Sequence, residues 1–210
     1  MVTHKNILIT AGPTWVAIDS VRVISNTATG NTGILLSKAF LARSAKVTLL
    51  LGPAERSFSD KRVRVIRYRF FDELNNLLAK ELKTGAYDAV IHAAAVSDYR
   101  PKQVYRKKVS SRLRGWNIKL VPTPKLINNL SSGKKRLLKV GFKFEPEAAD
   151  KRLIAEGRDL LKESGLDFVV ANTVNKKAYR AFIIGMSGIA GPLLSKAAMS
   201  KQLCGLLNKE

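Results

Sequence analysis

Short apolar runs alternate with amphipathic segments along most of the chain, and this alternation constrains the fold more than any other feature. The order begins strand–helix–strand–strand–helix–strand, which predicts a parallel sheet covered by helices, with ligands beyond the carboxyl ends of its strands. We therefore expect an α/β protein with a mostly parallel sheet and a three-layer αβα arrangement. The expected strands are 7–10, 46–51, 63–68, 88–95, 117–121, 137–144, 167–174 and 181–186, and the expected helices are 31–45, 73–83, 125–130, 147–164 and 192–208.

The first strand and the helix after it enclose a loop that resembles a ligand site. Small residues at 11–14 end the strand and let a ligand approach the backbone closely. The loop then carries Asp19, Arg22 and Asn26 before Gly30 and Gly33, which stand where the helix 31–45 begins. Backbone N–H groups at the start of a helix attract anions. This stretch predicts a phosphate-binding site at the edge of a Rossmann-like sheet.

Length and composition indicate a single domain. A chain of 210 residues with 46% hydrophobic content can bury one full core, so one domain over residues 1–210 is expected. No run of 18 apolar residues occurs, and no membrane partner is expected. Cys204 is the only cysteine, so no intramolecular disulfide is possible. We expect a cytoplasmic protein, because thiols persist in a reducing compartment.

The chain is strongly basic, with 37 Lys and Arg against 16 Asp and Glu and a net charge of +21. Residues 99–144 contain 14 Lys and Arg and no acid, and they include an expected basic lid or arm at about 100–117. Such a stretch suits a solvated surface, a phosphate-handling surface or a nucleic-acid arm. Tyr99, Tyr105 and Trp116 lack the regular spacing of a stacking platform, so nucleic acid is not the expected partner.

Two familiar nucleotide fingerprints are missing. An NAD site needs G-x-G-x-x-G directly after the first strand and an acid at the end of the second. Here about twenty residues separate Thr10 from Gly30, and the second strand ends in Leu51 and Gly52. A P-loop would need Gly-Lys-Ser/Thr, whereas Ile34 follows the last glycine of the loop. A Rossmann-type oxidoreductase and a nucleic-acid-binding module are kept as alternatives.

The two histidines do not suggest a metal centre. His4 and His92 are isolated from other potential ligands in the sequence, so no metal-ligating residue is proposed. His92 lies inside an apolar strand, where a buried structural histidine is favoured over a catalytic one.

Five motifs in unbroken order closely resemble phosphopantothenate–cysteine ligase, an enzyme family of coenzyme A biosynthesis. They cover roughly residues 5–175. The motifs are ITAGPT followed by DSVR, ISN and TGNTG at 9–33, AAAVSDYRP at 93–101, IKLVPTP at 118–124, VGFKFE at 140–145 and DFVVANTV at 167–174.

The resemblance implies a two-step ligase that works as a homodimer. The carboxylate of 4′-phosphopantothenate would attack the α-phosphate of CTP or ATP, with Mg²⁺, and cysteine would then displace the nucleoside monophosphate. Nothing in the sequence separates CTP from ATP. A free-standing ligase is expected, without the flavin-dependent decarboxylase that is fused ahead of it in many bacteria.

The resemblance also implies roles for individual residues. Asn26 and Arg22 match residues at the acyl-nucleotide intermediate, and Lys108 matches a catalytic lysine of a mobile lid that also contacts the nucleotide. Gly30 and Gly33 are expected to hold a phosphate of the substrate. Asp98 suits a ribose hydroxyl or a magnesium-linked water. The further nucleotide contacts expected are His92, Ala93, Ala94, Pro124, Lys125, Leu126, Ile127 and Phe142.

The chain departs from the family pattern at two places. Asn31 stands where bacterial relatives carry a lysine in the glycine loop, which leaves more of the phosphate binding to backbone amides. Two lysines that relatives bring to the triphosphate are replaced by Leu160 and Ser164. Arg158 and Lys162 lie two residues earlier and are candidate replacements.

Overall fold

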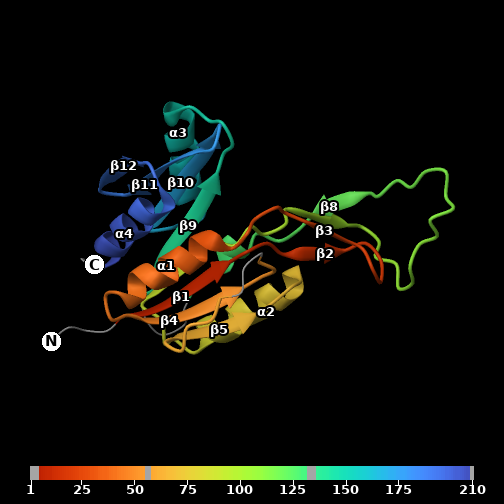
Figure 1. Ribbon diagram of the computed structural model, residues 1–210, viewed down its shortest axis with the longest axis horizontal. Coiled ribbons are helices and arrows are strands. Elements are labelled where there is room, and N and C mark those ends of the chain that lie inside the picture. The colour runs from red at the N-terminus through yellow and green to blue at the C-terminus, as the bar shows by residue number, and fades with distance from the viewer. Residues whose placement is uncertain (1–4, 55–57, 132–135, 209–210) are drawn as a thin grey trace.

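The centre of the fold is an eight-stranded sheet, described here from a computed structural model that covers residues 5–54, 58–131 and 136–208 (Figure 1). Six neighbouring strands are parallel and have the chain order 3-2-1-4-5-6, which is the order of dinucleotide-binding folds. Two antiparallel strands extend the sheet at one side. Across the sheet the strands are β12 (Gly188–Leu193), β11 (Ala178–Gly185), β10 (Phe168–Asn175), β9 (Leu138–Phe144), β6 (Ala89–His92), β1 (Asn6–Ala11), β4 (Lys46–Leu51) and β5 (Val63–Arg67).

Helices cover both faces of this sheet, so the expected three-layer α/β class is confirmed. Side chains alternate along each strand, and Ile9 of β1 packs under one helix layer while Leu8 packs under the other. One face carries α1 (Asn31–Leu41) and α4 (Lys196–Leu207). The opposite face carries α2 (Phe71–Lys83), the one-turn 3₁₀ helix η1 (Leu126–Asn129) and α3 (Asp150–Glu163).

Gly33 allows the first turn of α1 to lie directly on β1. A Cβ atom at this position would come 2.2 Å from the Cβ of Ala11, which is far inside van der Waals contact. The missing side chain therefore sets the distance between helix and strand, and with it the position of the preceding loop.

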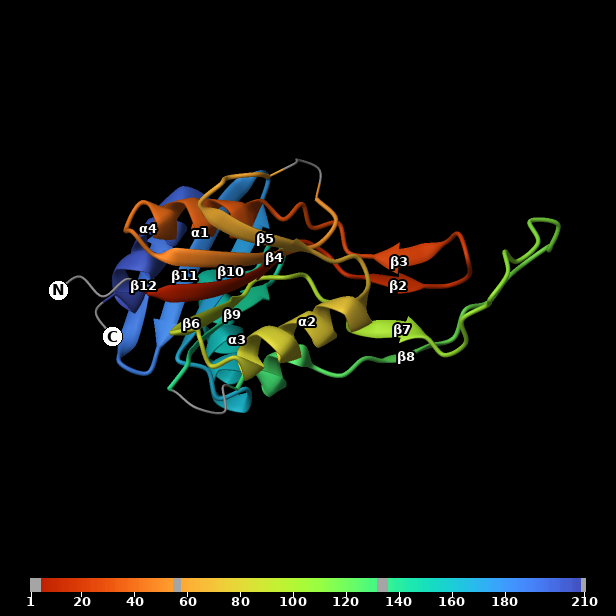
Figure 2. The same cartoon turned by 90° about the horizontal axis from the view of Figure 1, so that it is seen from below.

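Two antiparallel ribbons project beyond the carboxyl ends of the parallel strands (Figure 2). One pairs β2 (Trp15–Ala17) with β3 (Val23–Ser25), and the other pairs β7 (Tyr99–Pro101) with β8 (Leu120–Pro122). We call these two ribbons and the connection between β7 and β8 the arm. The backbone N–H of Tyr105 donates to the carbonyl of Ile18 over 3.0 Å, which ties the long connection to the first ribbon.

Most expected elements are present, and three differences are informative. The strands β2 and β3 were not predicted, because three-residue strands are too short to show a period. The helix predicted over 192–208 begins only at Lys196, and Pro192 lies in β12, an edge strand, where proline is tolerated. The segment predicted as a helix over 125–130 forms only the turn η1.

None of the helices in the described residues has the length and apolar character needed to cross a bilayer. Two of the basic residues in the acid-free stretch, Lys134 and Lys135, lie outside the described residues.

Candidate active site

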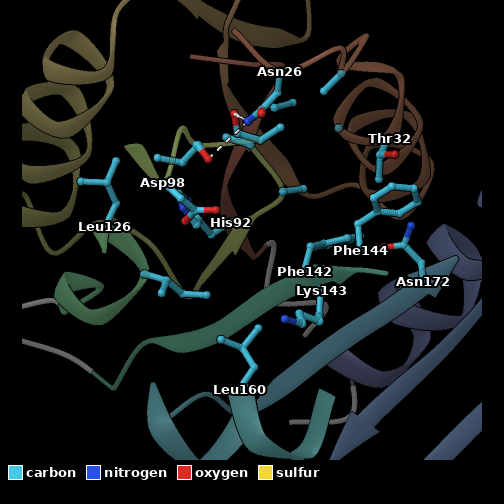
Figure 3. A pocket seen from close by; sticks show the side chains of 18 of the residues that line it. Asn26, Thr32, His92, Asp98, Leu126, Phe142, Lys143, Phe144, Leu160 and Asn172 are labelled. Atoms are coloured by element: carbon cyan, nitrogen blue, oxygen red, sulfur yellow. Dashed lines mark hydrogen bonds between the residues drawn. The ribbon is translucent and has the colours of Figure 1, made fainter. Parts of the chain in front are cut away.

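A cavity of about 1060 Å³ opens at the carboxyl edge of the sheet, where the connections after β1 and β6 lead to helices on opposite faces of the sheet. Ligands bind at this place in open α/β sheets, because the diverging connections leave a crevice. The walls are formed by the loop before α1, the loop after β6, η1, the ends of β9 and β10, and the first residue of α4, with α3 at one side (Figure 3).

Asn26 connects the two loops that frame the cavity. Its side-chain nitrogen donates to the carbonyl oxygens of Ala95 at 3.0 Å and Val96 at 3.3 Å. Two further hydrogen bonds hold the same loops together, because Thr14 accepts from the backbone N–H of Ser97 at 2.9 Å and donates its own N–H to Ala95 at 3.2 Å. Asn26 is therefore fixed at the mouth of the cavity while its side chain stays exposed.

The start of α1 presents backbone donors to the same cavity. Gly30 precedes the helix with a φ of 76°, a left-handed conformation that glycine adopts without strain. Gly30 has no side chain to cap the helix, and the backbone N–H of Asn31 makes only a long hydrogen bond of 3.5 Å to the hydroxyl of Thr29, so the first-turn N–H groups are available to a ligand in the cavity. Both predicted phosphate residues, Gly30 and Gly33, line the cavity.

His92 ends β6 at the floor of the cavity and is only 7% exposed. Its Nδ1 lies 3.0 Å from the hydroxyl of Thr10, which also accepts from the backbone N–H of Ala94. Burial lowers the pKa of His92 to about 4, because the charged imidazolium would lose its hydration. The ring is neutral near pH 7, in line with the structural role predicted from the sequence.

Asp98 and Lys125 form an ion pair at the cavity rim, with both side chains more than half exposed. This pairing joins the loop after β6 to the segment before η1. Six further predicted nucleotide contacts also line the cavity, and these are Ala93, Ala94, Pro124, Leu126, Ile127 and Phe142.

Comparison with known proteins places this architecture in a family. Residues 2–208 match the family described as the DNA/pantothenate metabolism flavoprotein C-terminal domain. The chain belongs to this family. The membership confirms the resemblance found in the sequence motifs.

A relative from Borreliella burgdorferi, the coenzyme A biosynthesis bifunctional protein CoaBC, is 30% identical over 97% of the chain and 52% of the relative. The chain thus spans about half the length of the curated relative it matches. A crystal structure of the DNA/pantothenate metabolism flavoprotein from Streptococcus pneumoniae has a TM-score of 0.86 at 22% identity and covers 98% of this chain and 99% of that one. The C-terminal domain of a CoaBC protein gives a TM-score of 0.79 at 25% identity, covering 98% and 94%.

Two residues predicted to act at the cavity lie in the arm instead. Arg22 donates to the carboxylate of Asp19 at 2.9 Å and to the carbonyl of Val109 at 3.1 Å, and it stacks over Trp116 at 5.4 Å. Lys108 directly precedes this contact, on the exposed connection between β7 and β8. Neither residue lines the cavity of its own chain.

Asp19 is the buried anchor of this arrangement. Burial opposes its ionisation, but hydrogen bonds from the backbone N–H groups of Val21, Val109 and Arg22 hold the pKa of Asp19 below its usual value. The carboxylate therefore stays charged near neutral pH and fixes both sides of the arm.

The candidate replacements on α3 also lie off the cavity. Arg158 and Lys162 are exposed, whereas Leu160 and Ser164 line the wall. The helix places residues four apart on one face, so a shift of two residues turns the side chains away. The residues that α3 and its C-cap contribute to the wall are acidic or neutral: Glu156, Asp159, Leu160, Glu163 and Ser164.

Sequence reasoning missed several residues that line the cavity, and four of them are informative. Lys143 on β9 forms ion pairs with Glu145 at 3.0 Å and Glu156 at 3.2 Å. Partial burial opposes its charge, but these hydrogen bonds raise the pKa of Lys143. Lys143, Phe144 and Asn172 belong to motifs quoted in the sequence analysis. Those motifs end at the carboxyl edge of the sheet, and this position could have indicated the three residues. The other three are Phe144, Asn172 and, at the start of α4, Lys196.

Proposed function

We propose that the chain is a phosphopantothenate–cysteine ligase. Support comes from the cavity at the carboxyl edge, where Asn26, the start of α1 and the loop after β6 converge in the order of the family's motifs. The name of the Borreliella burgdorferi relative, a coenzyme A biosynthesis protein, points to the same pathway.

The reaction requires a carboxylate to be activated before an amine can attack it. A carboxylate oxygen of 4′-phosphopantothenate attacks the α-phosphorus of the nucleotide, and the bond to pyrophosphate breaks. The amine of cysteine then attacks the acyl carbon, the nucleoside monophosphate leaves, and the amine loses a proton. Binding two anions next to each other is the main difficulty, and preorganised donors reduce its cost.

Asn26 has the geometry for the second step. Because its side-chain nitrogen is engaged by Ala95 and Val96, its oxygen Oδ1 is left to accept a hydrogen bond from the attacking amine. His92 is neutral and buried, so it helps to shape the floor and does not supply positive charge.

CTP or ATP serves as the activating nucleotide in this proposal. Magnesium would enter with the triphosphate, since the part of the chain that the structure describes contains no cluster of three or more potential metal ligands. Mg²⁺ commonly binds through substrate phosphates and one or two carboxylates. In this proposal Asp98, in the loop after β6 at the cavity rim, is the carboxylate that binds Mg²⁺. A cytoplasmic location goes with this function, in which the buried thiol of Cys204 stays reduced.

We further propose a homodimer in which the arm of one copy completes the cavity of the other. Arg22 and Lys108 lie in the arm and do not line the cavity of their own chain, so in this proposal they act at the cavity of the partner. The arm also exposes apolar side chains that need a partner, each between 38% and 64% exposed: Val21, Val23, Tyr99, Val104, Leu113 and Leu120.

Pyrophosphate release tests the proposed activity. The protein is incubated with 4′-phosphopantothenate, Mg²⁺ and one of the four nucleoside triphosphates, with and without cysteine. Release that depends on phosphopantothenate, followed by an amide product when cysteine is added, is expected with CTP or ATP. Absence of both with every nucleotide would overturn the proposal.

A further inference from the structure

Charged groups are unevenly distributed around the cavity. Its described wall carries five carboxylates and three lysines. Asp98 is paired with Lys125, and Glu145 is paired with Lys143. The other three carboxylates, Glu156, Asp159 and Glu163, lie on α3, and of these Glu156 also pairs with Lys143. The α3 side of the cavity is therefore acidic, although the whole chain is strongly basic.

Lys196 is the third lysine of the wall and lies on the opposite side of the sheet from α3. Among the described residues it forms no ion pair, and its side chain is partly buried. Lys196 therefore brings into the cavity a positive charge that no carboxylate of the described residues pairs with.

The sheet register places Lys196 near the start of α1. Phe144 pairs with Asn172, Asn172 with Ala181, and Ala181 with Leu193, so these residues form one row across four strands. Lys196 follows three residues after the end of this row. The row faces the layer of α1 and α4, and both helices begin at the carboxyl edge of the sheet. Figure 3 shows Phe144 and Asn172, which are partners in the register, and Thr32 of α1 above them in this view.

The position of Lys196 is electrostatically unfavourable in the free protein. It is the first residue of α4, where the helix dipole already contributes partial positive charge. The nearby start of α1 adds further N–H groups of the same sign, of which that of Asn31 reaches the hydroxyl of Thr29 over 3.5 Å. Three sources of positive potential thus face one part of the cavity, and Glu145, the wall carboxylate that follows Phe144 in the sequence, is already paired with Lys143.

We propose that Lys196 is a phosphate-binding residue, whose ammonium and the first-turn amides of α1 together hold one phosphate group of a substrate. This inference rests on the proposed ligase function. It adds to that function by stating which side of the cavity binds a phosphate group and which side does not. The phosphate group binds between the starts of α1 and α4, and the carboxylates of α3 exclude it from the other side. Phosphopantothenate and the nucleoside triphosphate both carry such a group.

Calorimetric binding of inorganic pyrophosphate at about physiological salt tests the site without requiring turnover. The test variant is Lys196→Met, and the matched control is Lys201→Met, which removes an exposed lysine of the same helix away from the cavity. Affinity should fall on the order of 10-fold or more in Lys196→Met, because a charge-assisted hydrogen bond is lost, and stay unchanged in the control. Lys196→Arg should retain most of the affinity.

Equal affinities in wild type and Lys196→Met would overturn the proposal, and so would equal losses in both lysine variants, since these would indicate only a general charge effect. Titrating phosphopantothenate and CTP or ATP separately identifies the source, because only the ligand whose phosphate contacts Lys196 loses affinity in Lys196→Met. Selective pyrophosphate binding in a protein without ligase activity would leave the phosphate site standing and refute the proposed function alone.

Discussion

The side-chain nitrogen of Asn26 lies 3.0 Å from the carbonyl oxygen of Ala95, and this hydrogen bond joins the loop after β1 to the loop after β6. The two loops lead to helices on opposite faces of the sheet, and backbone hydrogen bonds such as the one from the N–H of Ala95 to the carbonyl of Gly12, at 2.9 Å, hold their first residues together. Asn26 thus has a structural task as well as its proposed chemical one. Substitutions at this position have to be designed with both in mind.

The first prediction concerns Asn26→Asp, a change that preserves size. The carboxylate cannot donate to Ala95 and Val96, and its charge would face two carbonyl oxygens. We expect the side chain to turn away and the turnover to fall on the order of 10²-fold, as for the loss of a positioned polar group at a reaction centre. Quenched-flow measurement of acyl-nucleotide and product checks this. Asn26→Ala is the control without the charge, and activity within a few-fold of wild type in both variants would remove Asn26 from the site.

The second prediction concerns the contact of α1 with β1. Gly33→Ala places a Cβ 2.2 Å from that of Ala11, so the helix start has to move. Overpacking of this kind typically costs about 1–3 kcal/mol of stability. Urea unfolding should show this loss, together with weaker nucleotide binding. Gly205→Ala in α4 is the control, because its Cβ meets nothing within 4 Å and should stabilise the helix by about 0.5 kcal/mol. Equal stability of wild type and Gly33→Ala would show that helix and strand adapt freely.

Much of the sheet could be predicted because buried parallel strands are continuous apolar runs. The runs that became β1, β4, β9 and β10 were predicted to within a residue or two at each end. The ribbons of the arm were beyond such reasoning, since β2 and β3 gain their stability from each other and from contacts such as the hydrogen bond between Tyr105 and Ile18. The strand β12 was missed because Pro192 suits both an edge strand and the start of a helix.

The site was predictable where it follows a strand end. Asn26 and Gly30 lie in the connection from β1 to α1, Asp98 lies in the loop after β6, and all three line the cavity. Arg22 lies in the same connection, in the turn between β2 and β3. These two strands were not predicted, and they place Arg22 in the arm, away from the cavity. Lys196 could not be found from local sequence, because the antiparallel extension of the sheet decides where α4 begins.

The third prediction is a pH dependence of stability caused by His92. Burial lowers its pKa from 6.5 to about 4 in the folded protein, so the unfolded chain binds the proton more tightly. This contribution to stability is fully present above pH 6.5 and is lost as the pH falls towards 4. The total is about 3 kcal/mol, from about 1.4 kcal/mol for each pH unit.

Urea unfolding between pH 4 and 7.5, compared for wild type and His92→Asn, isolates this effect. The variant is expected to be less stable at pH 7.5 and to lose less stability on acidification. Parallel curves would show that the imidazole is accessible to protons in the folded state, contrary to its burial.

The last prediction tests whether the arm of one copy serves the cavity of another. Arg22→Ala removes an arm residue and Asn26→Ala removes a cavity residue, and each variant alone should be nearly inactive. In a mixed dimer one site carries both changes and the other carries neither. With random exchange of subunits, about a quarter of all sites are then intact, because the partner's arm supplies the missing group. Co-expression of the two variants should therefore restore about a quarter of the wild-type rate.

The control for this experiment pairs Asn26→Ala with Asp98→Ala. Both residues line the cavity of the same chain, so no mixed dimer contains an intact site and activity should stay low. Sedimentation at the assay concentration verifies that dimers are present in both mixtures. Recovery in the control would indicate that exchange of subunits is not the cause. A mixture of Arg22→Ala and Asn26→Ala that stays as inactive as its components, while dimers form, would mean that Arg22 acts within its own chain or not at all. The hydrogen bond from Arg22 to Asp19 would then be its whole role, as an anchor of the arm.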